Sequence, residues 1–147
     1  VVVAAHDADA LPRVISDHFQ TQSARLVRGF CKLCDGPIDA TPTVATDHDA
    51  ATNPPELDVT FVCRACGDVT HLNVGVVAFH FPELRAFLLE AGVDLRDRYL
   101  WELDFLLDPD VCAHEDPFRV ELVVDIDGDA LAITVDESLS LVTCERQ

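Results

Sequence analysis

Two pairs of cysteines have the spacing of a metal site. Cys31 and Cys34 form one C-x-x-C motif, and Cys63 and Cys66 form a second one after residues 35–62. Two intervening residues allow a single tight turn to present both sulfurs to the same ion, and two such turns supply four thiolates. Structural zinc sites have this ligand set, with Zn–S distances of about 2.3 Å. The sequence therefore predicts a four-cysteine site for structural Zn²⁺.

Glycines near both motifs support this interpretation. Gly36 and Gly67 lie within two residues of the second Cys of their pair, where the turn needs backbone angles that glycine adopts without strain. Because four thiolates fill the coordination sphere, we predict no catalytic role for the metal. Iron in place of zinc and a redox dithiol are the alternatives. A dithiol would need only one C-x-x-C, and neither pair follows a strand and opens a helix.

The other cysteines and histidines are weaker candidates. His71 follows Cys66 by five residues and could replace a Cys as ligand, but we expect it beside the site or at the surface. Cys112 and Cys144 fall in or beside expected strands, where we expect small buried side chains. A second metal site that includes His114, or a Cys-His nucleophile formed by Cys112 and His114, are the open alternatives.

A small enzyme that uses carboxylates is a competing hypothesis. In the segment WELDF, Glu102 and Asp104 share one face of an expected strand, where solvent is the simpler environment. A deep pocket that converges on them would favour catalysis. Asp127-Gly128 is typical of a hairpin turn and not of a calcium loop, which has its glycine at the sixth position. The sequence contains no P-loop, nucleophile-elbow or zinc-protease motif. We therefore predict no enzyme and no catalytic residue.

The charge balance is strongly acidic. Asp and Glu total 27 against 10 Lys plus Arg, the net charge is −17, and Lys32 is the only lysine. This balance is typical of a cytoplasm with molar salt, where a Debye length of about 3 Å screens self-repulsion, and it indicates a halophilic archaeon. Without a basic patch to neutralise phosphates, the chain is not expected to bind nucleic acid itself. Apolar runs are too short for a membrane span, and a cytoplasmic location is expected.

The elements that position the cysteines follow from periodicity. Residues 8–30 have helical spacing and a stop at Gly29, and residues 81–93 form a helix that begins at Pro82 and ends at Gly92. The first helix is expected to carry an apolar stripe made of Leu11, Val14, Ile15, His18 and Phe19, extended by Leu26 and Val27. Strands are expected at 38–46, 57–63, 68–74, 100–108, 118–126, 129–136 and 139–145, with a polar loop at 47–56.

These elements predict an α+β fold in three parts. Residues 1–30 are a helical linker or dimer segment, residues 31–75 are a zinc-ribbon-like pair of β-hairpins, and residues 76–147 are one helix followed by an antiparallel β-meander. The chain contains no Met, so we expect a further domain upstream of Val1.

Beyond these patterns, the chain resembles the C-terminal region of haloarchaeal winged-helix regulators, which are ArsR-like in their N-terminal part. The resemblance covers roughly residues 20–147. It rests on the two C-x-x-C motifs, on HFPELRAFLLEAGVDLRDRYLWELDF and on EDPFRVELVVDIDGDALAITVDESLSLVTCER. It implies zinc ligation by Cys31, Cys34, Cys63 and Cys66, a DNA-binding domain upstream, and no catalytic residue.

We therefore expect the regulatory and assembly module of a DNA-binding transcriptional regulator. The partner is expected to be a second copy of the chain, because winged-helix regulators of this type usually read two half-sites. DNA contact is expected only through the missing winged-helix domain, and the small-molecule effector is undefined. The alternative is a redox- or metal-sensing thiol module, in which oxidation of the four cysteines releases zinc and changes the dimer.

Overall fold

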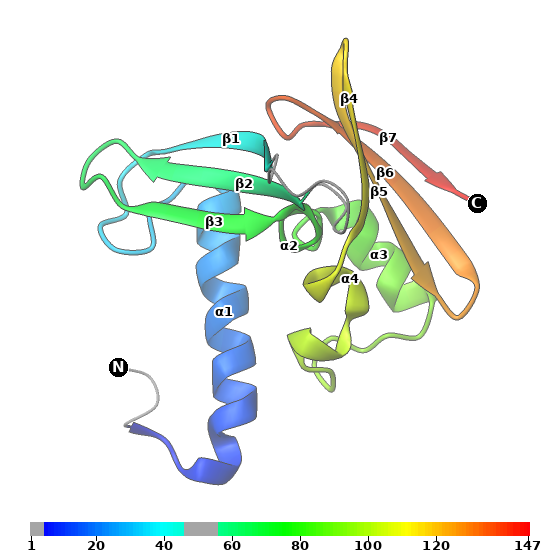
Figure 1. The fold of residues 1–147 in the computed structure, drawn as a ribbon. Coiled ribbons are helices and arrows are strands. Elements are labelled where there is room, and N and C mark those ends of the chain that lie inside the picture. Colours follow the sequence, from blue (N-terminus) through cyan, green and yellow to red (C-terminus); the bar gives the residue numbers. More distant parts are fainter. Residues whose placement is uncertain (1–4, 46–55) are drawn as a thin grey trace.

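The computed structural model describes residues 5–45 and 56–147, which form helices and two antiparallel sheets (Figure 1). This confirms the predicted α+β class. The helices are η2 (Ala8–Ala10), α1 (Leu11–Val27), α2 (Val74–Ala78), α3 (Pro82–Glu90), η3 (Leu100–Glu102) and α4 (Asp104–Leu107). The strands are β1 (Ile38–Ala45), β2 (Glu56–Cys63), β3 (Val69–Asn73), β4 (Asp110–Glu115), β5 (Phe118–Ile126), β6 (Asp129–Asp136) and β7 (Leu141–Arg146). The polar loop expected at 47–56 lies outside the described residues, except for Glu56.

Helix α1 ends where the sequence predicts, at a glycine in the left-handed region. Gly29 has a φ of 85°. Its N–H donates to the Leu26 carbonyl at 2.9 Å, and the Phe30 N–H donates to the Arg25 carbonyl at 2.9 Å. This pair of bonds is a Schellman motif, which satisfies the last helical carbonyls. It also turns the chain directly into the first cysteine pair.

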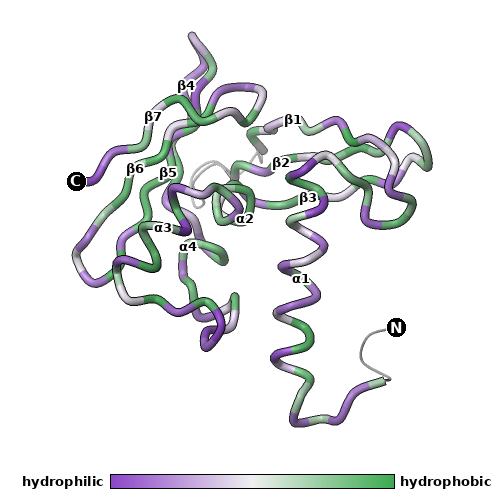
Figure 2. The backbone as a smooth tube through the Cα atoms, turned by 180° about the vertical axis from the view of Figure 1, so that it is seen from behind, coloured by the Kyte–Doolittle hydropathy of each residue, from purple (hydrophilic) through white to green (hydrophobic). Residues whose placement is uncertain are grey.

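The apolar stripe predicted for α1 reaches the core at its C-terminal end, where Leu26 is buried and Val27 packs against the hydrophobic core. Ile15 and Phe19 are 45% and 42% exposed, whereas Ser16 and Ser23 are buried. Hydrophobic and hydrophilic residues alternate around the whole helix (Figure 2). The small side chain of Ser16 lets α1 approach the backbone at the start of η3, where the Leu100 N–H donates to Ser16 Oγ at 3.2 Å. Periodicity missed this face because serine counts as polar although it fits a tight backbone contact.

The first sheet has the strand order β1-β2-β3, and its strands match the predicted ones to within one residue. Ile38 is opposite Cys63, and Val62 is opposite Val69. The β2–β3 connection is therefore the second cysteine pair itself. Residues alternate along β2, and the side chains that face the core are those of Leu57, Val59 and Phe61. This alternation is the reason the strand was predictable.

The second sheet has the order β4-β5-β6-β7, as expected for a meander, but its first strand is not the predicted one. Residues 100–107 form η3 and α4, whereas a strand was expected at 100–108. The Tyr99 N–H donates to the Glu102 carboxylate at 2.6 Å, which caps η3 and favours helix over strand. The hairpin at Asp127-Gly128 is confirmed, with φ values of 55° and 93°, which suit a tight two-residue turn.

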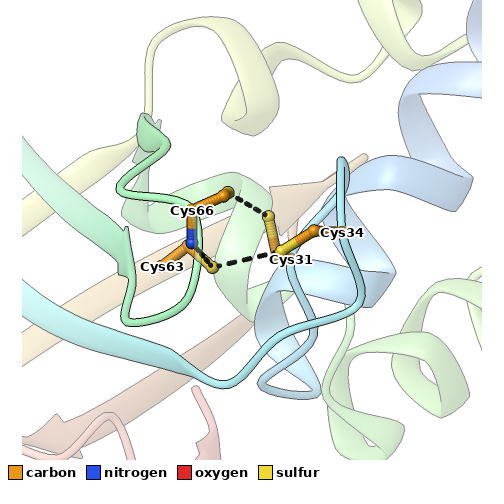
Figure 3. A group of neighbouring side chains, drawn as sticks. All are labelled: Cys31, Cys34, Cys63 and Cys66. Carbon is orange, nitrogen blue, oxygen red and sulfur yellow. Dashed lines mark hydrogen bonds between the residues drawn. The ribbon is translucent and has the colours of Figure 1, made fainter.

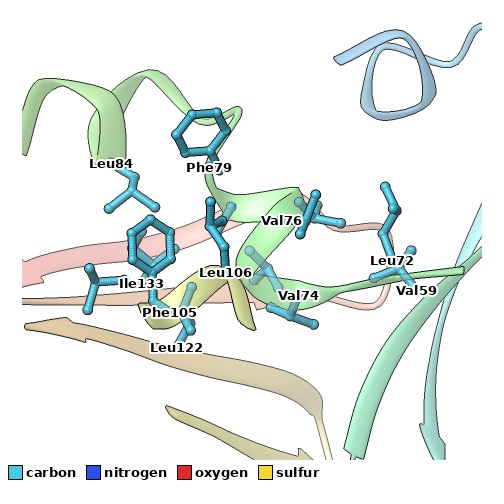
Figure 4. Packing of buried hydrophobic residues seen from close by; sticks show 14 of the residues in the cluster. Val59, Leu72, Val74, Val76, Phe79, Leu84, Phe105, Leu106, Leu122 and Ile133 are labelled. Atoms are coloured by element: carbon cyan, nitrogen blue, oxygen red, sulfur yellow. The ribbon is translucent and has the colours of Figure 1, made fainter. Parts of the chain in front are cut away.

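One hydrophobic cluster contains residues from both sheets and from α2, α3 and α4 (Figure 4). Val59 and Leu72 enter it from the first sheet, and Leu122 and Ile133 enter it from the second. Helix α2 lies between them and is buried throughout, a helix that the sequence analysis did not assign. The cluster crosses the boundary expected near residue 75, and the division into three parts stays a prediction.

Candidate metal centre

All four predicted ligands meet at one point (Figure 3). The Sγ atoms lie within 4.8 Å of one another. Cys31 Sγ is 3.7 Å from Cys66 Sγ, and Cys34 Sγ is 3.6 Å from Cys63 Sγ. Four sulfurs at about 2.3 Å from one tetrahedral ion are roughly 3.8 Å apart, whereas a disulfide brings two sulfurs to about 2.05 Å. The four sulfurs thus have the spacing of a mononuclear metal site.

The first knuckle, residues 31–36, follows directly from the end of α1. The Cys31 N–H donates to the Gly36 carbonyl at 2.9 Å, and the Asp35 N–H donates to the Cys31 carbonyl at 3.2 Å. The Leu33 N–H points at Cys31 Sγ, 3.4 Å away. Backbone N–H groups aimed at sulfur stabilise the thiolate form that a metal requires. Phe30 and Pro37 form a bridge that closes the base of the turn.

The second knuckle, residues 63–68, repeats this pattern. The Cys63 N–H donates to the Asp68 carbonyl at 2.9 Å, and the Gly67 N–H donates to the Cys63 carbonyl at 3.0 Å. The Ala65 N–H lies 3.4 Å from Cys63 Sγ. The two motifs therefore fold into the same turn, one after a helix and one inside a hairpin.

The two glycines have different roles. Gly67 has a φ of 77°, as expected for a knuckle glycine, but the residue in the equivalent place of the first knuckle is Asp35, with a φ of 60°. Gly36 is needed for space instead. A Cβ there would lie 2.7 Å from the Ala65 Cβ and 3.2 Å from Cys63 Sγ. The expectation that Gly36 supplies a glycine-specific backbone angle is wrong, because aspartate tolerates the left-handed region.

Polar contacts also join the two knuckles. The Arg64 N–H donates to the Pro37 carbonyl at 3.0 Å. The Lys32 ammonium lies 3.6 Å from the Asp68 carboxylate. Each contact links the turn of one cysteine pair to the turn of the other. This hydrogen bond and this ion pair therefore help to hold the two knuckles together independently of a metal.

Burial divides the ligands into two kinds. Cys31 and Cys63 are buried, whereas Cys34 and Cys66 are exposed. The backbone N–H of Cys66 lowers the pKa of Cys63 to about 6, since it favours the thiolate. Cys63 is therefore largely in the thiolate form near pH 7.

Cys66 is the opposite case. The backbone N–H of Asp68 lowers its pKa, but the sulfurs of Cys34 and Cys63 outweigh this effect and raise the pKa to about 12. Four adjacent thiolates repel one another unless a cation lies between them. Binding of a metal must therefore displace the Cys66 proton near pH 7, and metal affinity falls as the pH falls.

The remaining predicted candidates lie elsewhere. His71 is exposed on β3, where its Nδ1 lies 3.0 Å from Thr60 Oγ1, and it is not part of the cysteine cluster. Cys112 is exposed, so the expectation of a buried side chain is wrong for it, because β4 is an edge strand. Its Sγ lies 3.9 Å from His114 Nε2. Cys144 is half-buried, and burial raises its pKa.

Glu102 and Asp104 line a cavity of about 450 Å³ beside α4, together with Asp125 and Asp127. All four residues are exposed. Glu102 already accepts the hydrogen bond that caps η3. Cys112 and His114 line neither this cavity nor the one between α1 and α3. The absence of catalytic residues stays a prediction.

Sequence reasoning missed one residue at the metal centre. The Arg25 guanidinium, in the last turn of α1, donates to the Cys31 carbonyl at 3.2 Å and pairs with the Asp35 carboxylate. Arg25 precedes Cys31 by 6 residues, and only the Schellman turn brings the two together. A basic residue in the last turn of a helix is common because it interacts favourably with the helix dipole. Its presence in the sequence therefore did not indicate a contact with the cysteine turn.

Comparison with known proteins gives a family without an assigned activity. No curated protein and no solved structure matches the chain significantly. Among the described residues, no helix is long and apolar enough to cross a membrane. Residues 1–141 match the domain of unknown function DUF7351. Because this match covers nearly the whole sequence, the chain belongs to the DUF7351 family.

Proposed function

We propose that this chain is a zinc-stabilised regulatory and assembly module of a DNA-binding transcriptional regulator. The observation that carries the metal part is the spacing of four sulfurs on two equivalent knuckles, with opposed sulfurs 3.6 and 3.7 Å apart. Bound zinc would supply a cross-link between the α1–β1 and β2–β3 connections. With four thiolates as ligands, the ion would have no open position for a substrate.

The regulatory part rests on three supporting features. The chain resembles the C-terminal region of haloarchaeal winged-helix regulators. Its net charge of −17 makes direct contact with DNA unfavourable, so DNA contact would come from another domain. Ile15 and Phe19, one turn apart on α1, are both more than 40% exposed, which suits a homodimer contact through residues 1–30.

Metal content tests the first part of the proposal. Wild-type chain, kept reduced in molar KCl, should contain about one zinc by elemental mass spectrometry. Cys63→Ala should contain a small fraction of that amount. Cys112→Ala is the matched control, because that thiol is exposed and outside the cluster, and it should retain full zinc. Wild-type protein that folds without any metal would refute the zinc site.

DNA binding and oligomeric state test the second part. A protein that carries a winged-helix domain before residues 1–147 should shift operator DNA, whereas residues 1–147 alone should not. Sedimentation equilibrium should find a dimer of residues 1–147 that Phe19→Glu dissociates. A monomeric wild-type chain would remove the assembly role while leaving the zinc site unaffected.

A redox-sensing thiol module is the second candidate, and the exposure of Cys34 and Cys66 favours it. Exposed thiolates are accessible to oxidants in a way that buried ones are not. Mild peroxide would then release zinc reversibly and change the oligomeric state or the affinity of the full-length protein for DNA. A structural site instead retains its zinc until the chain unfolds.

A further inference from the structure

A second site is suggested by a cavity between the C-terminal half of α1 and the start of α3. It has a volume of about 360 Å³, which is within the range of small-molecule sites. Its lining includes Arg25 from α1, Arg28 at the C-terminal cap of that helix, His80, and Arg85 from α3. Unlike the metal centre, this cavity contains no cysteine.

The charge of this lining is opposite to that of the chain. The protein has 27 Asp plus Glu and only 10 Lys plus Arg, yet three arginines line the cavity and none of its lining residues is acidic. The Asp35 carboxylate compensates Arg25, whereas the like charges of Arg28 and Arg85 are unfavourable together unless an anion or solvent compensates them. At molar salt the long-range field of the protein is screened within about 3 Å, so an anion in the cavity would interact mainly with these nearby arginines.

The arginines are positioned but incompletely paired. Arg85 Nε donates to the Phe79 carbonyl at 3.2 Å, and its guanidinium stacks on the Phe79 ring, 4.9 Å from the centroid. These contacts fix the orientation of the Arg85 guanidinium plane and leave its terminal N–H groups available to donate to a ligand. Arg25 already pairs with the Asp35 carboxylate and donates to the Cys31 carbonyl, but its Nε is enclosed and has no hydrogen-bond partner among the described residues. Within the same part of the chain, neither Arg28 nor Arg85 forms an ion pair with a carboxylate.

His80 adds a group that can respond to an anion. Its Nε2 lies 2.8 Å from Ser23 Oγ, and that hydroxyl donates its hydrogen to the Phe19 carbonyl at 2.8 Å. The Ser23 oxygen therefore accepts from Nε2–H, and Nδ1 carries the lone pair in the neutral ring. Burial, with the nearby charges of Arg85 and Arg28, lowers the pKa of His80 to about 4.

We propose that the cavity lined by Arg25, Arg28, His80 and Arg85 binds a small molecule that carries a phosphate group. Guanidinium groups form bidentate hydrogen bonds with phosphate oxygens. Arginines from two helices surround one space, which suits a dianion with three acceptor oxygens better than a single carboxylate. The inference does not depend on the role in transcription, but the cavity shares Arg25 with the first knuckle, where this residue contacts the Cys31 carbonyl and Asp35.

Calorimetric titration of the 147-residue chain with inorganic phosphate tests this proposal. Ionic strength is held constant with KCl, so that only the identity of the anion changes. We expect saturable binding that Arg28→Gln weakens by at least about tenfold, since a charged hydrogen-bonding partner is lost. Acetate should bind at least about tenfold more weakly than phosphate, because it presents one carboxylate and one charge.

Arg96→Gln is the matched control. Arg96 is exposed and paired with Asp94, away from the cavity, and its loss should leave phosphate binding within about twofold of wild type. Because Arg85 packs on Phe79, Arg85→Lys is the second variant, which keeps the charge and loses the bidentate fork. Circular dichroism of each variant establishes that it is folded.

The ring of His80 supplies an independent readout. Phosphate between Arg28 and Arg85 offsets their charges, so NMR titration should find the pKa of His80 raised from about 4 when phosphate is bound. Three results would overturn the proposal: no saturable binding, an equal effect of Arg96→Gln, or equal affinity for acetate and phosphate. The first two refute the site, and the third refutes the phosphate class.

Discussion

Protonation of His80 should make the fold sensitive to acid well above the range in which carboxylates titrate. The pKa of this residue in the folded chain is about 4, whereas an unfolded histidine has a pKa of about 6.5. Between these values the unfolded chain binds a proton that the folded chain does not. Stability is therefore complete above pH 6.5 and is lost as the pH falls towards 4.

The size of the effect follows from the same interval. At about 1.36 kcal/mol for each pH unit, the difference between 6.5 and 4 sets an upper limit of roughly 3 kcal/mol on the change in unfolding free energy, and solvent screening at this partly exposed ring reduces it. We expect about 1 kcal/mol to be lost by pH 5. Since a domain of this size has about 5–15 kcal/mol of stability in total, the loss is a measurable fraction.

The assay compares urea unfolding of wild type and His80→Gln between pH 7 and pH 5, in chloride without phosphate. Glutamine can still donate to Ser23 Oγ but does not titrate, so the stability of this variant should fall by about 1 kcal/mol less than that of wild type over this range. Metal release at low pH lowers the unfolding free energy of both proteins equally, so it cancels when the two are compared. His114→Gln, at an exposed position, should behave like wild type. Parallel curves for wild type and His80→Gln would refute the reasoning.

Two glycines, Gly36 and Gly75, have no space for a Cβ, and Gly92 serves as a comparison. Gly36→Ala should weaken zinc affinity at least about tenfold, because its Cβ would lie 2.7 Å from the Ala65 Cβ. The double variant Gly36→Ala/Ala65→Gly should recover most of this loss in a chelator competition assay, and an absence of rescue would contradict the packing argument. Gly75→Ala should destabilise the chain by about 3 kcal/mol in urea, since its Cβ would lie 2.0 Å from the Phe105 carbonyl oxygen. At Gly92 a Cβ would meet no atom within 4 Å, and only the φ of 81° disfavours alanine, so Gly92→Ala should reduce the unfolding free energy by about 1–2 kcal/mol. A larger reduction for Gly92→Ala than for Gly75→Ala would contradict the steric argument.

The metal cluster could be predicted because its information is local and chemical. The C-x-x-C spacing fixes two sulfurs at each turn, and the structure brings Cys31, Cys34, Cys63 and Cys66 together. Strands with clear alternation, such as β2, were predictable for a similar reason. The segment at 100–107 was not, because WELDF alternates like a strand while the Glu102 carboxylate caps a helix.

The cavity at His80 shows what sequence patterns omit. Arg25 and Arg28 are more than fifty residues from Arg85 in the sequence, and no motif connects them. Their convergence depends on how α1 packs, which periodicity alone does not predict. Ile15 and Phe19 of the predicted stripe are exposed, whereas Ser16 and Ser23 of the same helix are buried. Small polar residues at a tight contact carry little signal in a hydrophobicity pattern.

The junction between β3 and α2 has a mechanical consequence. Strand β3 ends at Asn73 and α2 begins at Val74, so no linker residue separates the two elements. The Asn73 side chain accepts from the Val76 N–H at 2.9 Å and donates to the Leu106 carbonyl at 2.8 Å. The Asn73 side chain therefore holds β3, α2 and α4 in one fixed arrangement. Because no flexible residue separates β3 from α2, a rotation of the β2–β3 hairpin, which carries the second knuckle, would also rotate α2. The packing of α2 against the second sheet would then change as well.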